Sequence, residues 1–216
     1  MKARFVYENG ISELREISTK TENGITKAYL PKDTVGEGVS YIDFMCDVFT
    51  AKTGDDGYFI TNHGTLGTFL TRFVEKEDTE IVRDHSFIAC FGFNKGKSGL
   101  FAIVTGMRCD FGMVLGVKDG VYYTYPRFYI DGDAMYEDIE VELYELEDGS
   151  YSAMARLYRE FQLTRCGCVP LKERAASEPR IKNAVDGIEV RVRQGWKPAP
   201  SPVEYQTPET EPPMHV

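Results

Sequence analysis

The stretch Ile139-Glu-Val-Glu-Leu-Tyr-Glu-Leu146 decides the fold class of this chain. Apolar residues at 139, 141 and 143 alternate with Glu140 and Glu142, so one side of an extended segment is apolar and the other is charged. This period of two is typical of a β-strand that lies with one face on a core and the other in water. We therefore predict a strand over 139–146, with the carboxylates of Glu140 and Glu142 in solvent.

Stretches rich in Val, Ile, Phe, Tyr and Thr recur before this strand, separated by turn residues. They cover residues 4–7, 25–30, 39–50, 57–61, 67–74, 86–93, 99–105, 111–116 and 121–125. Asn9-Gly10 and Asn23-Gly24 predict hairpin turns, because both central residues of a type I′ turn need positive φ. About ten strands with no intervening helix predict a mainly β domain over residues 1–147, either a sandwich or a barrel.

The pattern changes after Asp148-Gly149-Ser150, where the Ser150 hydroxyl can cap a helix. The apolar residues that follow recur at i, i+3, i+4 and i+7, which predicts an amphipathic helix. They are Met154, Leu157, Tyr158 and Phe161. We expect this helix to bury that stripe and to end near Cys166-Gly167, where glycine permits a left-handed cap.

The remaining residues are interpreted as linkers. A second short helix is expected to start at Ser177 and stop at Gly187, followed by a strand over 188–193. Six prolines follow Trp196, which favours an extended tail with few contacts. The expected organisation is thus a β-sandwich at 1–147, linker helices and a strand at 148–195, and an extended Pro-rich linker at 196–216.

Composition excludes several classes of protein. The 25 Lys and Arg against 34 Asp and Glu give a net charge of −9, which disfavours generic nucleic-acid binding. No apolar run approaches the roughly 18 residues that span a bilayer, so no membrane partner is expected. The first residues lack the apolar core of a secretory signal. We therefore expect a cytoplasmic location, unless a leader has been removed.

Cysteine, histidine and carboxylate patterns give no metal or cofactor site. The five cysteines have irregular spacing, and Cys46 and Cys90 lie in apolar runs typical of buried reduced thiols. Cys166-Gly-Cys168 lacks the second ligand pair of a structural zinc site. Calcium near Asp131, Asp133, Glu137 and Asp138 is an alternative, although the spacing lacks the glycine and glutamate of an EF-hand loop. We expect no metal and no cofactor.

An aromatic cluster is the candidate ligand-binding surface. Its tyrosines are Tyr122, Tyr123, Tyr125 and Tyr129. Aromatic faces with a polar tip can stack on sugar rings, so carbohydrate is a possible partner. Alternate residues of a strand point to opposite faces, so about half of this cluster belongs to the core by geometry.

Several local motifs resemble those of a bacterial glycoside-hydrolase-like group. A glycine-rich segment of that group, in which Gly-Asp-x-Gly-Tyr precedes Pro-Asp-Gly-Ser-Gly-Ala-Leu, is similar to residues 51–60 and 63–73. Asn62-His63 stands here where Pro-Asp is usual. The group's last sandwich strand and its Tyr-Ser-x-Met-Ala-x-x-Tyr-Arg linker helix resemble residues 139–146 and 151–161, and Pro170-Leu-Lys-Glu-Arg174 matches the stretch that follows. The resemblance covers about residues 40–175.

The resemblance implies a fold and a partner. The group is related to endo-α-N-acetylgalactosaminidases and, more distantly, α-galactosidases, in which a galactose-mutarotase-like β-super-sandwich precedes a (β/α)8 barrel. The catalytic carboxylates lie on that barrel, which this chain does not contain, so no catalytic residue is transferred to it. The residues expected at a contact with the barrel are Asp55, Asp56, Tyr58, His63 and Trp196.

Three functions remain open from the sequence. The first is a non-catalytic sandwich module that packs against the catalytic barrel of a parent protein. The second is a stand-alone carbohydrate-binding module. The third, a mutarotase-like enzyme, needs a His acid and a Glu base in one cleft, and neither His63 nor His85 has a recognisable Glu partner in the sequence.

Overall fold

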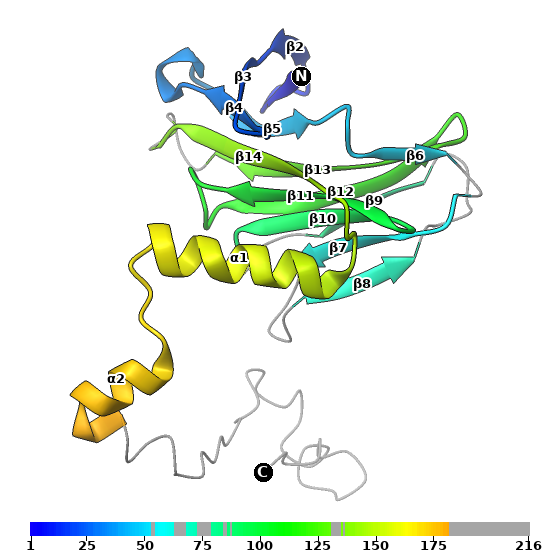
Figure 1. Ribbon diagram of the computed structural model, residues 1–216. Coiled ribbons are helices and arrows are strands. Elements are labelled where there is room, and N and C mark those ends of the chain that lie inside the picture. Colours follow the sequence, from blue (N-terminus) through cyan, green and yellow to red (C-terminus); the bar gives the residue numbers. More distant parts are fainter. Residues whose placement is uncertain are drawn as a thin grey trace, which may run out of the picture. The chain divides into compact units, whose positions relative to one another are not determined.

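The computed structural model describes residues 1–181, except 53–54, 63–67, 73–78, 84–85, 87, 131–134 and 136. Its contacts divide the chain into two units, Met1–Gln162 and Leu163–Val216. The first unit holds two antiparallel sheets that form a sandwich, with helix α1 (Tyr151–Arg165) starting directly after the last strand (Figure 1). The prediction of a mainly β sandwich is confirmed.

Sheet 1 has seven strands, in the order β2-β1-β5-β13-β12-β9, with β6 also paired to β13. The bounds are β1 (Lys2–Tyr7), β2 (Ser12–Glu16), β5 (Val39–Met45), β6 (Thr50–Lys52), β9 (Thr79–Arg83), β12 (Phe111–Lys118) and β13 (Val121–Tyr129).

Sheet 2 also has seven strands, in the order β3-β4-β14-β11-β10-β7-β8. The bounds are β3 (Ser18–Glu22), β4 (Ile25–Leu30), β7 (Tyr58–Asn62), β8 (Thr68–Arg72), β10 (Cys90–Lys95), β11 (Ser98–Val104) and β14 (Ile139–Leu146).

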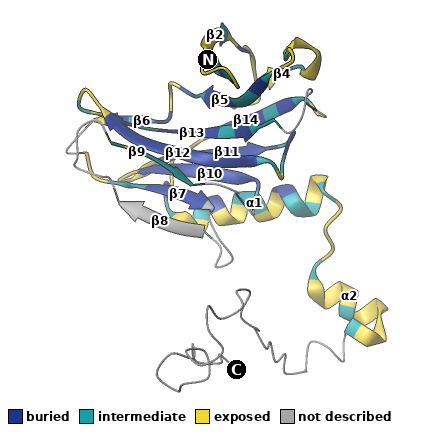
Figure 2. Cartoon of the chain, turned by 180° about the vertical axis from the view of Figure 1, so that it is seen from behind, coloured by how far each residue is buried: buried dark blue, intermediate teal, exposed yellow. Residues whose placement is uncertain are grey.

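Each of the ten predicted strands overlaps an observed strand, and β4 and β14 match the predicted bounds. The turn at Asn23-Gly24 joins β3 to β4 with positive φ at both residues, as predicted. The long stretch 39–50 is divided, because the chain turns between β5 and β6. The sequence pattern missed β2, β3 and β9. β3 is exposed along its whole length, so it carries no apolar face that periodicity can detect (Figure 2).

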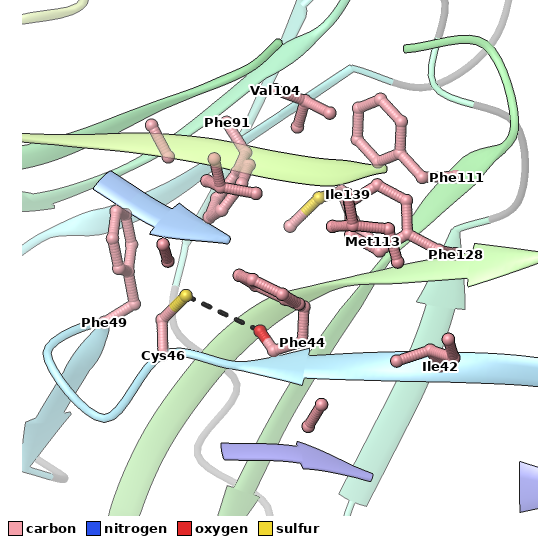
Figure 3. Close-up of a cluster of buried hydrophobic side chains, with 14 of the residues drawn as sticks. Ile42, Phe44, Cys46, Phe49, Phe91, Val104, Phe111, Met113, Phe128 and Ile139 are labelled. Atoms are coloured by element: carbon pink, nitrogen blue, oxygen red, sulfur yellow. Dashed lines mark hydrogen bonds between the residues drawn. The ribbon is translucent and has the colours of Figure 1, made fainter. Parts of the chain in front are cut away.

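The core lies between the inward faces of the two sheets. Phe44 packs edge-on against Phe128, with ring centroids 5.9 Å apart, and Phe111 lies 5.7 Å from Phe128 on the other side (Figure 3). Phe91 and Phe93 of β10 bring the inward face of sheet 2 to the same cluster. All five rings are fully buried. Between the sheets, the Phe59 ring of β7 lies edge-on to Tyr122 of β13 at 6.5 Å, and aromatic and aliphatic side chains together fill the core.

Both predicted buried thiols are buried, Cys46 in this core and Cys90 on the face of sheet 2 that helix α1 covers. Cys46 is 4% exposed and its Sγ lies 3.5 Å from the Phe44 carbonyl oxygen (Figure 3). Burial raises the pKa of the Cys46 thiol, because the thiolate loses its hydration. Cys90 is also buried, and both side chains are reduced thiols. Among the described residues, no helix is long and apolar enough to cross a membrane.

The prediction that Glu142 lies in water is wrong. Its side chain is fully buried, and its Oε1 pairs with Lys27 Nζ at 3.0 Å. Tyr144, two residues along β14, donates its hydroxyl to Glu142 Oε2 at 2.7 Å. Lys27 is the register partner of Glu142 on β4, so side chains from two strands cover the carboxylate. Alternation along a strand predicts on which face of the sheet a residue lies. It does not predict whether side chains from neighbouring strands cover that residue.

Helix α1 packs on the outward face of sheet 2. Ser150 caps it, accepting a hydrogen bond from the Ala153 N–H at 3.2 Å, and Gly167 follows its end with φ +66. Both ends were predicted. Of the predicted apolar stripe, Met154 and Phe161 are buried, whereas Leu157 and Tyr158 are only half-buried. Exposed residues cover much of α1 (Figure 2).

Met154 is the contact that fixes α1 to the sheet. Its side chain lies against Gly92 of β10 and Gly99 of β11. A small apolar pocket of about 120 Å³ borders it, between α1 and the sheet. Met154→Ala is expected to lower the free energy of unfolding by about 2 kcal/mol, the low end for a buried Met, because the neighbouring pocket already relaxes the packing. Urea denaturation measures the loss, and the half-buried Leu157→Ala should cost less; the reverse order would show that α1 is docked through another face.

The second unit holds α2 (Leu171–Ser177). The sequence pattern missed α2, which Pro170 and the helix-favouring residues after it start. Ser177 is the last residue of α2 and not a helix cap, because its hydroxyl donates to the carbonyl oxygens of Glu173 and Arg174. Residues 179–181 are helical, so a helix does begin at Pro179 as predicted, and its predicted end at Gly187 lies outside the described residues. The predicted strand at 188–193 and the Pro-rich tail from Trp196 lie outside the described residues.

Candidate functional site

Six polar and aromatic side chains gather on the outward face of sheet 1. They are Arg4, Asp43, Glu80, Tyr123, Tyr125 and Arg127, and we call them the tyrosine–arginine face. The strand register puts them there. Asp43 of β5 is paired with Arg4 on one side and Arg127 on the other, and Gly116 of β12 is paired with both Glu80 and Tyr123. Residues paired directly across a sheet share one face, so strands far apart in sequence build this surface.

Asp43 is the centre of the face. Its carboxylate is fully buried and is held by two guanidinium groups. Arg127 donates to Oδ1 at 2.6 Å from Nε and to Oδ2 at 3.1 Å from Nη2. Arg4 donates to Oδ2 from Nε at 3.0 Å and also from Nη2. Two-pronged contacts of this kind fix both partners in orientation. Asp43 is therefore enclosed and is not available as an acid or base.

Arg127 is held from a second direction. Its guanidinium lies 4.0 Å from the centre of the Tyr41 ring, a cation–π contact. Burial acts to lower the pKa of Arg127, but hydrogen bonding to Asp43 and the Asp43 charge outweigh it and raise that pKa. Arg127 therefore stays charged in the native protein.

The two tyrosines form a parallel pair beside the ion cluster. The rings of Tyr123 and Tyr125 are 5.8 Å apart and inclined by 7°. Both hydroxyls point to Glu80 Oε2, at 3.0 Å from Tyr123 and 3.4 Å from Tyr125. Arg4 Nη2 donates to the Tyr125 hydroxyl at 3.1 Å. One hydrogen-bonded network thus joins Asp43 to Tyr123 through Arg4, Tyr125 and Glu80.

Gly116 makes room for this arrangement. A Cβ at this position would lie 2.3 Å from Cζ of the Tyr123 ring, far inside van der Waals contact. Any other residue at 116 would displace the ring, because the Tyr123 side chain lies directly over the Gly116 backbone. The position of Tyr123 therefore depends on a glycine in the neighbouring strand.

The environment of Tyr123 predicts a measurable pH effect. Burial, together with the hydrogen bond to Glu80, raises the pKa of Tyr123 to about 12. Because the unfolded phenol titrates near pH ~10, the neutral phenol contributes stability that is fully present below pH ~10 and is lost as the pH rises through about 12. In Glu80→Gln we expect the pKa of Tyr123 to fall towards 10 and the stability to drop less across this window.

NMR of ring-labelled tyrosine measures this titration residue by residue. Tyr29 is the control, since its hydroxyl donates to Asp138 at 2.6 Å on the other sheet and its pKa should not respond to Glu80→Gln. Titration of native Tyr123 near its ordinary value of about 10 would show that the hydrogen bond to Glu80 does not persist in solution.

The structure separates the four predicted ligand-binding tyrosines. Tyr122 lies in the core, 1% exposed and edge-on to Phe59, so we leave it out of the candidate site. Tyr123, Tyr125 and Tyr129 project outward, and Tyr129 pairs with Tyr41 at the end of β13. The alternation expected along this strand is confirmed. Of these three, Tyr123 is the half-exposed ring of the stacked pair, whereas Tyr125 is 5% exposed.

Two of the residues predicted at an interdomain contact, Asp56 and Tyr58, lie elsewhere, at one end of the sandwich. Asp56 and Tyr58 line an open, polar cleft of about 640 Å³. Its other lining residues are Gly57, Asn94, Gly96, Lys97, Glu147, Asp148 and Ser150. Asp55 accepts a hydrogen bond from the Lys52 N–H at 2.9 Å, as expected of a turn-forming aspartate. His63 and Trp196 lie outside the described residues.

The acidic segment considered for calcium is only partly described. Asp138 accepts hydrogen bonds from Tyr29 and from the Lys32 N–H at 2.8 Å, and Glu137 accepts one from the Met107 N–H at 2.9 Å. Asp131 and Asp133 lie outside the described residues. Within the part of the chain that the structure describes, no three His, Cys, Asp or Glu side chains gather as a metal site.

Sequence reasoning missed the charged half of the tyrosine–arginine face. Asp43 and Arg127 each stand inside an otherwise apolar or aromatic stretch, and such a charge in mid-strand is the available signal. A buried charge needs a partner of opposite sign, so two such residues predict each other. Glu80 gave no signal, because its strand was not predicted.

Comparison with known proteins shows a similar fold in a glycoside hydrolase. No family model and no curated protein matches the chain. Among solved structures, the chain is similar to ligand-free alpha-N-acetylgalactosaminidase NagBb from Bifidobacterium bifidum, with a TM-score of 0.52 and 13% identity. The sandwich resembles a region of a glycoside hydrolase. The match covers 82% of this chain but 30% of NagBb, so the chain corresponds to less than a third of that protein's length.

Proposed function

We propose that this chain is a non-catalytic, galactose-mutarotase-like β-super-sandwich module of a glycoside-hydrolase-like protein, and that it packs against a (β/α)8 catalytic domain. The observation that carries the proposal is the unequal coverage of the match. Most of this chain superimposes on 30% of an alpha-N-acetylgalactosaminidase, so most of that hydrolase has no counterpart here. Two seven-stranded sheets also exceed the seven to nine strands of an immunoglobulin sandwich and support the larger super-sandwich class.

The carboxylates of the tyrosine–arginine face support a non-catalytic role for that face. Glycoside hydrolysis needs two carboxyl groups about 5 to 10 Å apart, one of them protonated. On the tyrosine–arginine face, Asp43 is sealed by two arginines and only Glu80 is open to solvent. A lone accessible carboxylate has no partner with which to divide the acid and base roles.

We expect the purified chain to hydrolyse neither p-nitrophenyl α-N-acetylgalactosaminide nor p-nitrophenyl α-galactoside. Release of p-nitrophenol, followed over hours at high protein concentration, is the measurement. Turnover that persists after repurification and disappears in Glu80→Gln or Asp55→Asn would contradict the non-catalytic assignment. Turnover unchanged in both variants would point to a contaminant and would leave the prediction standing once the contaminant is removed.

The packing partner is tested separately from activity. We expect a barrel-type catalytic domain to be encoded in the same reading frame or directly beside it, and we expect the two purified parts to co-elute on size exclusion. The polar end cleft, which contains Asp56 and Tyr58, is the proposed contact region. Asp56→Arg should reduce co-elution, and Glu13→Arg, an exposed change on β2, should not. Equal co-elution of both variants would contradict the assignment of this cleft.

A stand-alone carbohydrate-binding module is the second candidate. The half-exposed Tyr123 and the open carboxylate of Glu80 favour it, because sugar-binding surfaces combine aromatic faces with hydrogen-bonding groups. Absence of any encoded catalytic domain, together with saturable sugar binding, would favour this candidate over the first.

A further inference from the structure

The tyrosine–arginine face has an enclosed layer of side chains and an exposed layer in front of it. Behind lie the enclosed Asp43 carboxylate and Arg127, whose side chain is 12% exposed. In front lie Arg4 and Glu80, with side chains 34% and 39% exposed, beside the half-exposed ring of Tyr123. The enclosed ion pair fixes the exposed groups, because Arg4 is held at Nε and Nη2 and Glu80 is held by two tyrosine hydroxyls. The exposed groups are therefore pre-organised before any ligand arrives.

The exposed groups retain hydrogen-bonding capacity. Among the hydrogen bonds of the described residues, Nη1 of Arg4 donates none, so it presents N–H donors to solvent. Both tyrosine hydroxyls use Oε2 of Glu80, and Oε1 has only the distant Arg127 at 3.8 Å. One side of the face thus offers a donor and the other an acceptor, with an aromatic ring between the strands that carry them.

We infer that this face is a binding site for a neutral saccharide. Glu80 Oε1 would accept a hydrogen bond from a sugar hydroxyl, Arg4 Nη1 would donate one to a hydroxyl or ring oxygen, and the Tyr123 ring would contact the apolar face of the sugar. A sugar ring is the ligand class that presents adjacent donors and acceptors on one side and C–H groups on the other.

The charge balance of the face selects a neutral ligand. Two arginines face two carboxylates, so the four charges cancel and each guanidinium already has an acidic partner. An anionic sugar would place its carboxylate beside Glu80, which repels it. The exposed Glu80 disfavours a protein partner, because glutamate is depleted in protein interfaces.

This inference gives the second candidate function a site and a ligand class, and it does not depend on the proposed packing against a catalytic domain. A sandwich that packs against a catalytic domain through its end cleft can bind sugar on sheet 1 or not. Failure to bind sugar would remove the site and leave the packing proposal standing, whereas failure to co-elute with a barrel would do the reverse.

Saturation-transfer NMR on the full chain tests the site, with galactose, N-acetylgalactosamine and glucose as neutral probes and glucuronate as the charged probe. We expect saturable binding of at least one neutral sugar and weaker binding of glucuronate. Glu80→Gln and Tyr123→Ala should each weaken binding about tenfold, the effect of losing one charge-assisted hydrogen bond or one aromatic contact. Tyr29→Ala removes a tyrosine–carboxylate pair from the other sheet and should leave binding unchanged.

Each remaining outcome overturns the inference. No saturable binding of any neutral sugar would remove the site, and tighter binding of glucuronate would assign it to anions. Equal losses in Tyr29→Ala and Tyr123→Ala would place binding elsewhere. If circular dichroism shows that Tyr123→Ala does not fold, the sugar affinities of Tyr123→Phe and Glu80→Gln test the site instead. Unchanged affinity in Glu80→Gln rejects Glu80 as the proposed acceptor.

Discussion

Replacing Asp43 with alanine is expected to lower the free energy of unfolding by about 3 kcal/mol, because removing one partner of a buried ion pair leaves uncompensated charge. Asp43 is fully buried and accepts hydrogen bonds from both Arg4 and Arg127. Most of this loss of stability comes from leaving the Arg127 charge unpaired, because the Arg127 side chain is only 12% exposed. The more exposed Arg4 can turn into solvent. The measurement is chemical denaturation in urea, comparing midpoints at equal slope.

Two further variants separate charge from packing. In Asp43→Leu combined with Arg127→Met, no buried charge is left unpaired, so we expect much of the lost stability to return. Glu13→Gln removes the exposed ion pair with Arg15 and should leave the midpoint nearly unchanged. A loss in Asp43→Ala no greater than that in Glu13→Gln would contradict the central place given to Asp43.

Gly149→Ala is expected to destabilise the chain by about 3 kcal/mol, at the upper end of the cost of overpacking. A Cβ at 149 would lie 2.0 Å from the Ser98 carbonyl oxygen and 2.3 Å from its carbon, so the clash is with backbone that cannot swing away. The same turn is tied by the Gly149 N–H to Lys97 and by Asn94 Nδ2, which donates to the Gly149 carbonyl oxygen at 2.5 Å. The change would push the start of α1 away from the β10–β11 turn.

The matched control is Gly36→Ala. A Cβ at Gly36 would meet no heavy atom within 4 Å, so alanine fits there without a clash. Thermal denaturation of both variants measures the difference. Similar melting temperatures for the two would show that the close approach at Gly149 is not maintained in solution.

Local patterns predicted those parts of the fold that depend on neighbours in sequence. The alternation in 139–146 gave a strand with the observed bounds, and Asn23-Gly24 gave a hairpin. The spacing of Met154 and Phe161 gave a helix with a buried stripe. In each case the residues that carry the pattern are also the residues that make the contacts.

The candidate site could be predicted only in part, because it is assembled by register. Alternation along β13 predicts that Tyr123 and Tyr125 share a face and that Tyr122 does not. It does not say that β9 lies beside β12, which brings Glu80 to the tyrosines across 43 residues of sequence. The exposed face of β3 and the buried Glu142 show the same limit, since burial depends on what the neighbouring strands place over a residue.

The most direct test of this account is an NMR titration of the ¹⁵N-labelled chain with methyl α-N-acetylgalactosaminide. The amide signals report where the sugar binds, and the anomeric signal of the glycoside reports whether it is cleaved. The account predicts shifts concentrated at Glu80, Gly116 and Tyr123 on sheet 1, with the glycoside intact. Cleavage of the glycoside, or shifts confined to the end cleft around Asp56 and Tyr58, would contradict it.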